Sequence, residues 1–178
     1  MEILTPRLKL VPATAATHRM ESGAHDRLGR ELDAIIPAAW PPENLRDALE
    51  FFAQQLDSRP VLDGWRTWYW LATTPDADPR TLVGSGGFLR LPDEAGTVEI
   101  GYGTLDEFQS QGYATESVRA LTEWAFQQPG IARVTAEAEP KNRASVRVLE
   151  KCKFTLVVPG SEADHSLFDH CKTGEQTR

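Results

Sequence analysis

The chain of 178 residues suffices for one domain and not comfortably for two, and its 40% hydrophobic and 25% charged residues are ordinary for a globular protein with a core. The net charge of −7 argues against non-specific nucleic-acid binding, which needs a basic surface, and it permits a cationic substrate. No stretch approaches the roughly 20 apolar residues of a membrane-spanning helix and residues 1–12 lack a signal-peptide core, so we expect a cytoplasmic protein without nucleic-acid or membrane partners.

The first third of the chain is predicted to be one strand followed by helices. Residues 5–11 alternate in polarity, which is typical of a strand. Residues 14–58 are mostly helical in pattern, with breaks at Pro37 and at Pro41-Pro42. One apolar stripe recurs at three- and four-residue steps, made by Leu45, Leu49, Phe52 and Leu56.

Three strands are predicted next. Residues 67–72 are rich in aromatic side chains, residues 81–91 contain glycines within a strand-like pattern, and residues 97–105 alternate. Residues 75–80 and 92–96 are predicted turns. Consecutive strands joined by turns favour an antiparallel meander.

The second half alternates helices and strands. A helix is predicted over 112–127, stopped by Pro129-Gly130, with a buried stripe of Val118, Leu121, Trp124 and Ala125. A strand over 133–138, a helix over 142–151, a strand over 154–158 and a short strand near 166–168 follow. The second helix carries Ala144, Val148, Leu149 and Cys152 on one side. The order predicts an α+β fold, a mixed and mostly antiparallel central sheet flanked by helices, in one domain over 1–170 with a frayed tail over 171–178.

The segment with the clearest chemistry lies between a predicted strand and a predicted helix. Its residues are Gln109, Ser110, Gln111, Gly112, Tyr113, Ala114 and Thr115. A helix N-terminus presents unpaired N–H groups that suit an anion such as a pyrophosphate, and Gly112 allows close backbone approach. The segment lacks the Gly-Lys-Ser/Thr ending of a P-loop, and the glycines at 84–87 lack the third glycine and the helix of a dinucleotide fingerprint. A glycine at such a turn is also compatible with a turn alone.

A second signature is Asn142-Arg143-Ala144-Ser145. Helix capping by Asn142 accounts for it without any function. Together, however, the two signatures resemble the core of the GNAT superfamily of N-acetyltransferases over residues 97–158, since Glu150, Lys151 and Phe154 also match. Glu99-Ile100-Gly101-Tyr102, Gly112-Tyr113-Ala114-Thr115-Glu116 and Thr5-Pro6-Arg7-Leu8 are similar to the RimJ/RimL branch, which acetylates the N-termini of ribosomal proteins.

The resemblance implies an acyl-CoA N-acyltransferase fold and acetyl-CoA as co-substrate, with no metal. It implies that the backbone near Thr104 and Leu105 binds the pantetheine arm, that the segment from Gln109 to Thr115 cradles the pyrophosphate, and that Asn142 and Ser145 face the thioester. The acceptor would be a primary amine, on a small molecule or a protein N-terminus. A homodimer is a further expectation by analogy.

Acetyl transfer needs a base for the amine and an acid for the leaving thiolate. Glu99 is the candidate base, because Val98, Ile100 and Tyr102 alternate onto one face of the strand and leave Glu99 on the other; an outward, solvated glutamate is equally compatible with that pattern. The tyrosine that many relatives use as acid is replaced by Leu149, so Ser145 is the candidate acid, and Tyr102 is a weaker one.

Two other departures concern the backbone. Ser110 stands where the family loop has a glycine, and Lys153 stands where a glycine precedes Phe154, so a residue with a Cβ must make the turn after the helix. The aromatic residues Trp40, Trp65, Trp68, Tyr69 and Trp70 either form core or line an acceptor pocket. Cys152 and Cys171 have no metal-ligand or disulfide spacing and are expected to be reduced thiols.

Three functions remain open from the sequence. The chain is an active N-acetyltransferase, a catalytically silent acyl-CoA-binding sensor or assembly protein, or a phosphate-binding module unrelated to CoA. The paired loop and helix signatures argue against the third, and turnover separates the first two.

Overall fold

The computed structural model describes residues 1–21, 23–42, 49–58, 64–74, 77–89, 91–159 and 165–172. The elements in chain order are β1 (Ile3–Leu4), β2 (Leu8–Pro12), α1 (Ala15–Glu21), α2 (His25–Leu32), β3 (Ala34–Ile35), α4 (Leu49–Ser58), β4 (Thr67–Thr74), β5 (Ala77–Phe88), β6 (Thr97–Thr104), the 3₁₀ turn η2 (Asp106–Phe108), α5 (Tyr113–Gln127), β7 (Arg133–Ala138), α6 (Arg143–Lys151), β8 (Thr155–Pro159) and β9 (Ser166–Cys171). No described helix is long and apolar enough to cross a membrane.

The strands form one sheet in the order β1-β2-β4-β5-β6-β7-β9-β8, with β3 paired to β5 beside this path. The pairs β6–β7 and β3–β5 are parallel, and the remaining described pairs are antiparallel. The predicted α+β class, with a mixed and mostly antiparallel sheet, is therefore confirmed. The meander of β4, β5 and β6 is also as predicted.

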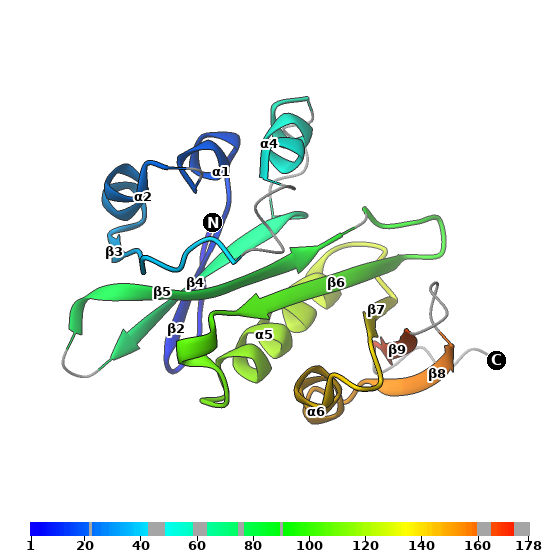
Figure 1. Cartoon of the computed structure of the whole chain (residues 1–178). Helices are drawn as coiled ribbons and strands as arrows, with labels where there is room; N and C mark the ends of the chain where they lie inside the picture. The colour runs from blue at the N-terminus through cyan, green and yellow to red at the C-terminus, as the bar shows by residue number, and fades with distance from the viewer. Residues whose placement is uncertain are drawn as a thin grey trace.

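Helices cover both faces of the sheet: α1, α2 and α4 lie on one side, and α5 and α6 on the other (Figure 1). Strand β4 shows why its sequence is apolar throughout. Trp68 and Trp70 pack into the core cluster shared with α5, and Tyr69 and Leu71 pack into the cluster shared with α2. A strand buried on both faces reads as a continuous apolar run. These aromatic residues are core, and so is Trp40, which is 2% exposed.

Several predicted boundaries are wrong, and pairing explains them. Strand β5 begins at Ala77, within the predicted turn, because Ala77 pairs with Thr74 of β4 and Arg80 pairs with Ala34 of β3; residues 75–76 lie outside the described part. Strand β3 itself interrupts the region predicted as helical. The expected opening strand is two strands, β1 and β2, separated by a turn in which the Thr5 hydroxyl accepts from Leu8 N–H at 2.9 Å.

The outcome for the predicted helix stripes is mixed. In α5, Val118, Leu121 and Ala125 are buried as predicted, and Trp124 is half-buried against Trp65. In the N-terminal stripe, Leu56 is half-buried; Leu45 and the side chains of Leu49 and Phe52 lie outside the described residues.

The C-terminal elements follow the prediction closely. Strand β7 has the predicted bounds, and β9 is present but longer than expected, because it pairs along its whole length with β7. Cys171 therefore belongs to the sheet and not to a tail; residues 173–178 lie outside the described part. Lys153 makes the turn after α6 with φ of 65°, the left-handed conformation that its position predicted.

Candidate active site

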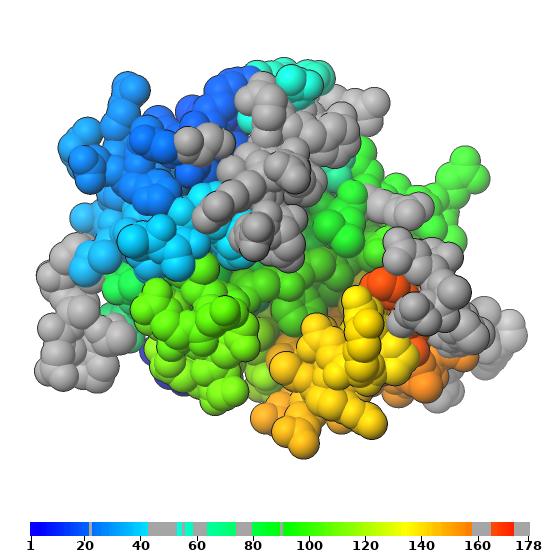
Figure 2. Space-filling view, viewed as in Figure 1, coloured from blue at the N-terminus to red at the C-terminus, as the bar shows by residue number. Residues whose placement is uncertain are grey.

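A cavity of about 790 Å3 is lined by the second half of β6, beyond the last residue of that strand that pairs with β7. The two strands pair in parallel only from Thr97 to Glu99, and after the pair Glu99–Thr135 their ladder ends. Figure 2 shows the surface on this side, with the light-green segment before α5 and the yellow α6 on either side of the green strands. The cavity walls come from α1, β5, β6, the segment before α5, and α6. The cavity is thus long enough to connect both layers of helices.

The backbone of β6 presents hydrogen-bonding groups to this gap. In its antiparallel ladder with β5, Glu99 C=O accepts from Leu89 N–H at 2.8 Å and Leu105 N–H donates to Val83 C=O at 3.0 Å. Backbone groups alternate in direction along a strand, so those of Tyr102 and Thr104 point the other way, toward β7. Both residues line the cavity.

This geometry corrects the expectation for Leu105. Its N–H is already used within the sheet, and its side chain is 5% exposed in the core cluster next to α2. Leu105 is therefore a packing residue, and Tyr102 joins Thr104 as the strand position available to a ligand.

The segment before α5 has the backbone of an anion cradle. Ser110 and Gly112 both have left-handed φ, at 60° and 87°. Helix α5 begins at Tyr113 with Gly112 as N-cap and with no side-chain cap, so the first N–H groups of the helix have no partner from a capping side chain. Ser110, Gly112, Ala114 and Thr115 line the cavity, as does Gln109. An anion at this position would meet the N–H groups and the positive end of the helix dipole.

The other members of this segment support its shape. The Gln109 amide donates to Asp106 Oδ1 at 2.7 Å, Gln111 C=O accepts from Arg7, and Tyr113 is 8% exposed in the core. The side chains of Gln111 and Tyr113 are not among the cavity-lining residues. Their predicted part in cofactor binding therefore rests on the backbone alone.

Asn142 and Ser145 lie at the start of α6, on the wall facing β6. The Asn142 side chain accepts from Ser145 N–H at 3.1 Å, so the capping role that the sequence allowed is present. The Ser145 hydroxyl lies 2.9 Å from the Tyr102 hydroxyl, which also donates to Ser145 C=O at 3.2 Å. The structure thus brings the two acid candidates together. Leu149, at the place of the family tyrosine, is fully buried.

Tyr102 is held as a neutral phenol. Burial raises its pKa from 10.0 to about 12, and the hydrogen bond with Ser145 opposes that rise only in part. The folded state therefore favours the protonated form, so this contribution to stability is complete below pH 10 and is lost as the pH rises through about 12. Across the neutral range Tyr102 remains a hydrogen-bond donor.

We therefore expect the stabilities of wild type and Tyr102→Phe to change differently with pH only above pH 10. The unfolding free energy of wild type should decline relative to that of the variant above pH 10, and a phenolate absorbance assignable to Tyr102 should appear only toward pH 12. Denaturant unfolding at several pH values and a spectrophotometric titration measure the two quantities. A Tyr102 phenolate at pH 9 would contradict the assignment.

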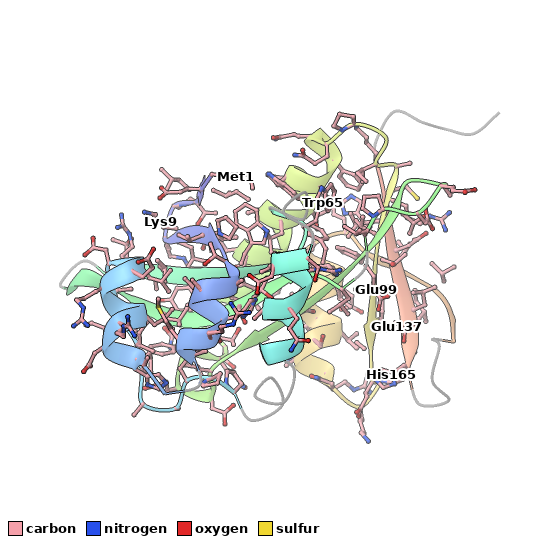
Figure 3. All side chains as sticks on the ribbon, turned by 90° about the horizontal axis from the view of Figure 1, so that it is seen from above. Met1, Lys9, Trp65, Glu99, Glu137 and His165 are labelled. Atoms are coloured by element: carbon pink, nitrogen blue, oxygen red, sulfur yellow. The ribbon has the colours of Figure 1, made fainter. Side chains whose placement is uncertain are left out.

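Glu99 lies on the face predicted for it. Val98 and Ile100 are buried in the cluster shared with α5, so Glu99 is on the opposite face, that of α1 and α4. Figure 3 shows Glu99 close to Glu137 of the neighbouring strand β7. The cavity is lined by Gly101, two residues further along the same face, and not by Glu99 itself. Glu99 is thus at the edge of the cavity.

The opposite end of the cavity holds a buried polar network that the sequence did not reveal. Glu21 is 2% exposed and accepts three hydrogen bonds: from His18 Nδ1 at 2.8 Å, from the Tyr69 hydroxyl at 2.5 Å and from Trp40 Nε1 at 3.0 Å. Burial and the adjacent Glu21 carboxylate raise the pKa of Tyr69 well above 10.0. His18 and Glu21 both line the cavity. The only sequence signal was their three-residue spacing on one helix, which is common and unspecific.

An arrangement of these features along one cavity suits acyl transfer from an anionic carrier. A helix N-terminus without a side-chain cap, strand backbone groups and a hydroxyl pair line one cavity, and the Glu21 carboxylate network lines it as well. Among the described residues, no group of three or more His, Cys, Asp or Glu side chains could hold a metal ion.

Comparisons with known protein families and with curated proteins both found matches. The family described as "Acetyltransferase (GNAT) domain" matches residues 7–155. The uncharacterized N-acetyltransferase YjdG of Bacillus subtilis (strain 168) is 30% identical over 168 residues, which cover 92% of this chain and 95% of that protein.

Two solved structures show the same fold. A putative GNAT-family acetyltransferase from Bordetella pertussis has a TM-score of 0.68 at 20% identity, over 96% of this chain and 99% of the other. The RimL ribosomal L7/L12 alpha-N-protein acetyltransferase, solved with coenzyme A, has a TM-score of 0.67 at 18% identity, over 98% of this chain and all of the other. With the family match over most of the chain, the protein belongs to the GNAT acetyltransferases and is an acetyl-CoA-dependent N-acetyltransferase.

Proposed function

We propose that the protein transfers the acetyl group of acetyl-CoA to a primary amine, either a small molecule or a protein N-terminus, by direct attack in a ternary complex. The observation that carries this proposal is the continuity of one cavity from the N-terminus of α5 to the His18–Glu21 network. The pyrophosphate would lie at the first end, against Gly112 and Ala114. The amine would enter from the face of α1, and the thioester would lie between them beside Tyr102 and Ser145.

Direct attack is favoured because neither cysteine suits an acetyl-enzyme intermediate. Cys152 does not line the cavity, its thiol donates to Thr115 C=O, and burial raises its pKa to about 11. A thiol that stays protonated is a poor nucleophile. Cys171 is exposed at the end of β9, outside the cavity-lining residues.

The proposed proton transfers use three side chains. Glu99, at the edge of the cavity, would take the proton of the incoming ammonium through a water molecule, so that the neutral amine attacks the thioester carbonyl. The Ser145 hydroxyl would protonate the departing thiolate and take a proton from Tyr102, 2.9 Å away. The second proton that the acetylated nitrogen loses would return to Tyr102, so that both hydroxyls end the cycle protonated. Because Tyr102 is a phenol at neutral pH, it has a proton to give.

The finer assignment is the RimJ/RimL branch, with a protein N-terminus as acceptor. Its support is the opening Thr5-Pro6-Arg7-Leu8 and the Gly112-Tyr113-Ala114-Thr115-Glu116 motif. Two of the similar folds are named as ribosomal-protein acetyltransferases, from Vibrio cholerae and Vibrio fischeri, at 20% and 15% identity.

The test is acceptor-dependent thiol release from acetyl-CoA, with a panel of small amines and short peptides with free N-termini. Glu99→Gln and Ser145→Ala should each lower kcat by about 100-fold, the range that general acid or base groups contribute. Ser145→Ala keeps the helix cap, because the cap uses the Ser145 backbone.

Glu137→Gln is the matched control for the base, since it removes the same charge from the same face of the neighbouring strand (Figure 3). A fall in Glu137→Gln with full activity in Glu99→Gln would show that the base is misassigned. Tight acetyl-CoA binding with no release for any peptide or amine would contradict the amine acceptors proposed.

A further inference from the structure

A contact between the start of the chain and the start of α5 is not explained by the proposed chemistry. Arg7 Nη1 donates to Gln111 C=O at 2.9 Å, and Arg7 Nε donates to Glu116 Oε2 at 2.7 Å. The Arg7 guanidinium also lies over the Tyr113 ring, 5.0 Å from its centroid. Arg7 thus contacts two residues of the segment that would bind the pyrophosphate, Gln111 and Tyr113, and also Glu116 directly after it.

Both carboxylate oxygens of Glu116 take part in this contact. Its Oε1 accepts from the Thr5 hydroxyl at 2.6 Å and from Arg7 N–H at 2.9 Å, while its Oε2 faces the guanidinium. Burial would raise the pKa of Glu116, but the hydrogen bonds from Thr5 and Arg7 outweigh burial and hold it below 4.5. Glu116 is therefore anionic at neutral pH, in the first turn of the helix whose N-terminus would hold the pyrophosphate.

An isolated carboxylate at that position would oppose CoA binding in two ways. Its charge repels the pyrophosphate, and it competes for the same unpaired N–H groups of the helix. The guanidinium offsets the charge, and the fork of hydrogen bonds keeps the carboxylate turned toward Arg7.

The bond to Gln111 has a separate consequence for the backbone. In a trans peptide, C=O and N–H point in opposite directions, so holding the Gln111 carbonyl toward Arg7 turns the Gly112 N–H away from Arg7. Gly112 lies between two cavities: Arg7 lines the smaller one, of about 570 Å3, and does not line the site cavity. The Gly112 N–H is therefore directed to the site side of the loop.

We propose that Arg7 is a positioning residue of the CoA site, which orients the Gln111–Gly112 peptide toward the pyrophosphate and offsets the charge of Glu116. This inference rests on the proposed function, because it needs CoA to bind at the N-terminus of α5. Arg7 itself does not touch the ligand.

The test is calorimetric titration of the full chain with CoA, and titration by NMR with pantetheine, which lacks the pyrophosphate. Arg7→Met should weaken CoA binding by about 10-fold or more and leave pantetheine binding unchanged, because the charge-assisted bonds act on the pyrophosphate end alone. The CoA affinity of Arg7→Lys should lie between those of wild type and Arg7→Met, because an ammonium keeps the positive charge but loses the forked pair of hydrogen bonds. Lys9→Met is the matched control, because it breaks the Lys9–Glu2 ion pair of 2.6 Å on the next strand and should change neither affinity.

A rescue separates positioning from general stabilisation. In the Arg7→Met background, adding Glu116→Gln removes the uncompensated charge. The double variant should bind CoA at least about 3-fold more tightly than Arg7→Met, which is the order of effect expected for one charge contact. Equal weakening of CoA and pantetheine, together with a lower Tm, would show a structural contact only. Unchanged CoA affinity in Arg7→Met would overturn the inference, whereas absence of CoA binding in wild type would overturn the proposed function instead.

Discussion

Glu21→Leu should lower the free energy of unfolding by about 3 to 5 kcal/mol, the cost of removing one partner from a buried charged network. The substitution leaves His18 Nδ1, the Tyr69 hydroxyl and Trp40 Nε1 without their acceptor in a region that is at most 2% exposed. Each such orphaned group costs free energy, because it gave up water on folding and gains no bond in return. Urea unfolding at neutral pH measures the change.

Two variants make that measurement specific. Glu31→Leu removes the same charge from an exposed position on α2 and should change stability by less than about 0.5 kcal/mol. Glu21→Gln keeps one acceptor oxygen, so its free energy of unfolding should lie between those of wild type and Glu21→Leu. If Glu21→Leu were as stable as wild type, the hydrogen bonds to Glu21 would make no net contribution to the free energy of unfolding.

Gly103→Val should lower kcat by about 100-fold while leaving the fold intact. Gly103 lines the cavity, and among the described residues no heavy atom lies within 4 Å of a Cβ added there, so the new side chain would occupy the space of the substrates. A displacement of a reacting group by about 1 Å is enough to lower kcat by about 100-fold, and a valine side chain is larger than that. The Tm should change little, because valine suits a strand and meets no clash.

Gly86→Val is the matched contrast. Gly86 lines the same cavity from the adjacent strand β5, but a Cβ there would lie 2.7 Å from the Trp70 ring and 2.8 Å from Tyr102 Cβ. We expect it to destabilise the protein by about 1 to 3 kcal/mol, the range for overpacking a filled core. Thermal unfolding and acetyl-CoA turnover, measured on both variants, distinguish a blocked site from a destabilised fold. Wild-type activity in Gly103→Val would show that the substrates do not bind next to Gly103.

The sequence predicted what local patterns determine. Strand β7, helix α5 and helix α6 lie where turn residues and apolar spacing placed them, within one residue at either end. The left-handed turn at Lys153 was predicted from the resemblance, because the family has a glycine there, whereas the left-handed φ of Ser110, which also replaces a family glycine, was not predicted. The segment before α5 was singled out because it joins a predicted strand to a predicted helix and because, together with Asn142 and Ser145, it resembles the GNAT core; its binding of the pyrophosphate stays a prediction.

Only the tertiary structure decided the features that depend on distant partners. Strand β3 and the start of β5 exist because strands elsewhere in the chain pair with them, and Leu105 is excluded from the ligand because Val83 takes its N–H. Glu21 meets Tyr69 across 48 residues and Arg7 meets Glu116 across 109, and neither spacing has a signature in the sequence. Hydrophobic periodicity reports which side of an element is buried, but a buried charge is tolerated only by its specific partners, and those partners are known only once the chain has folded.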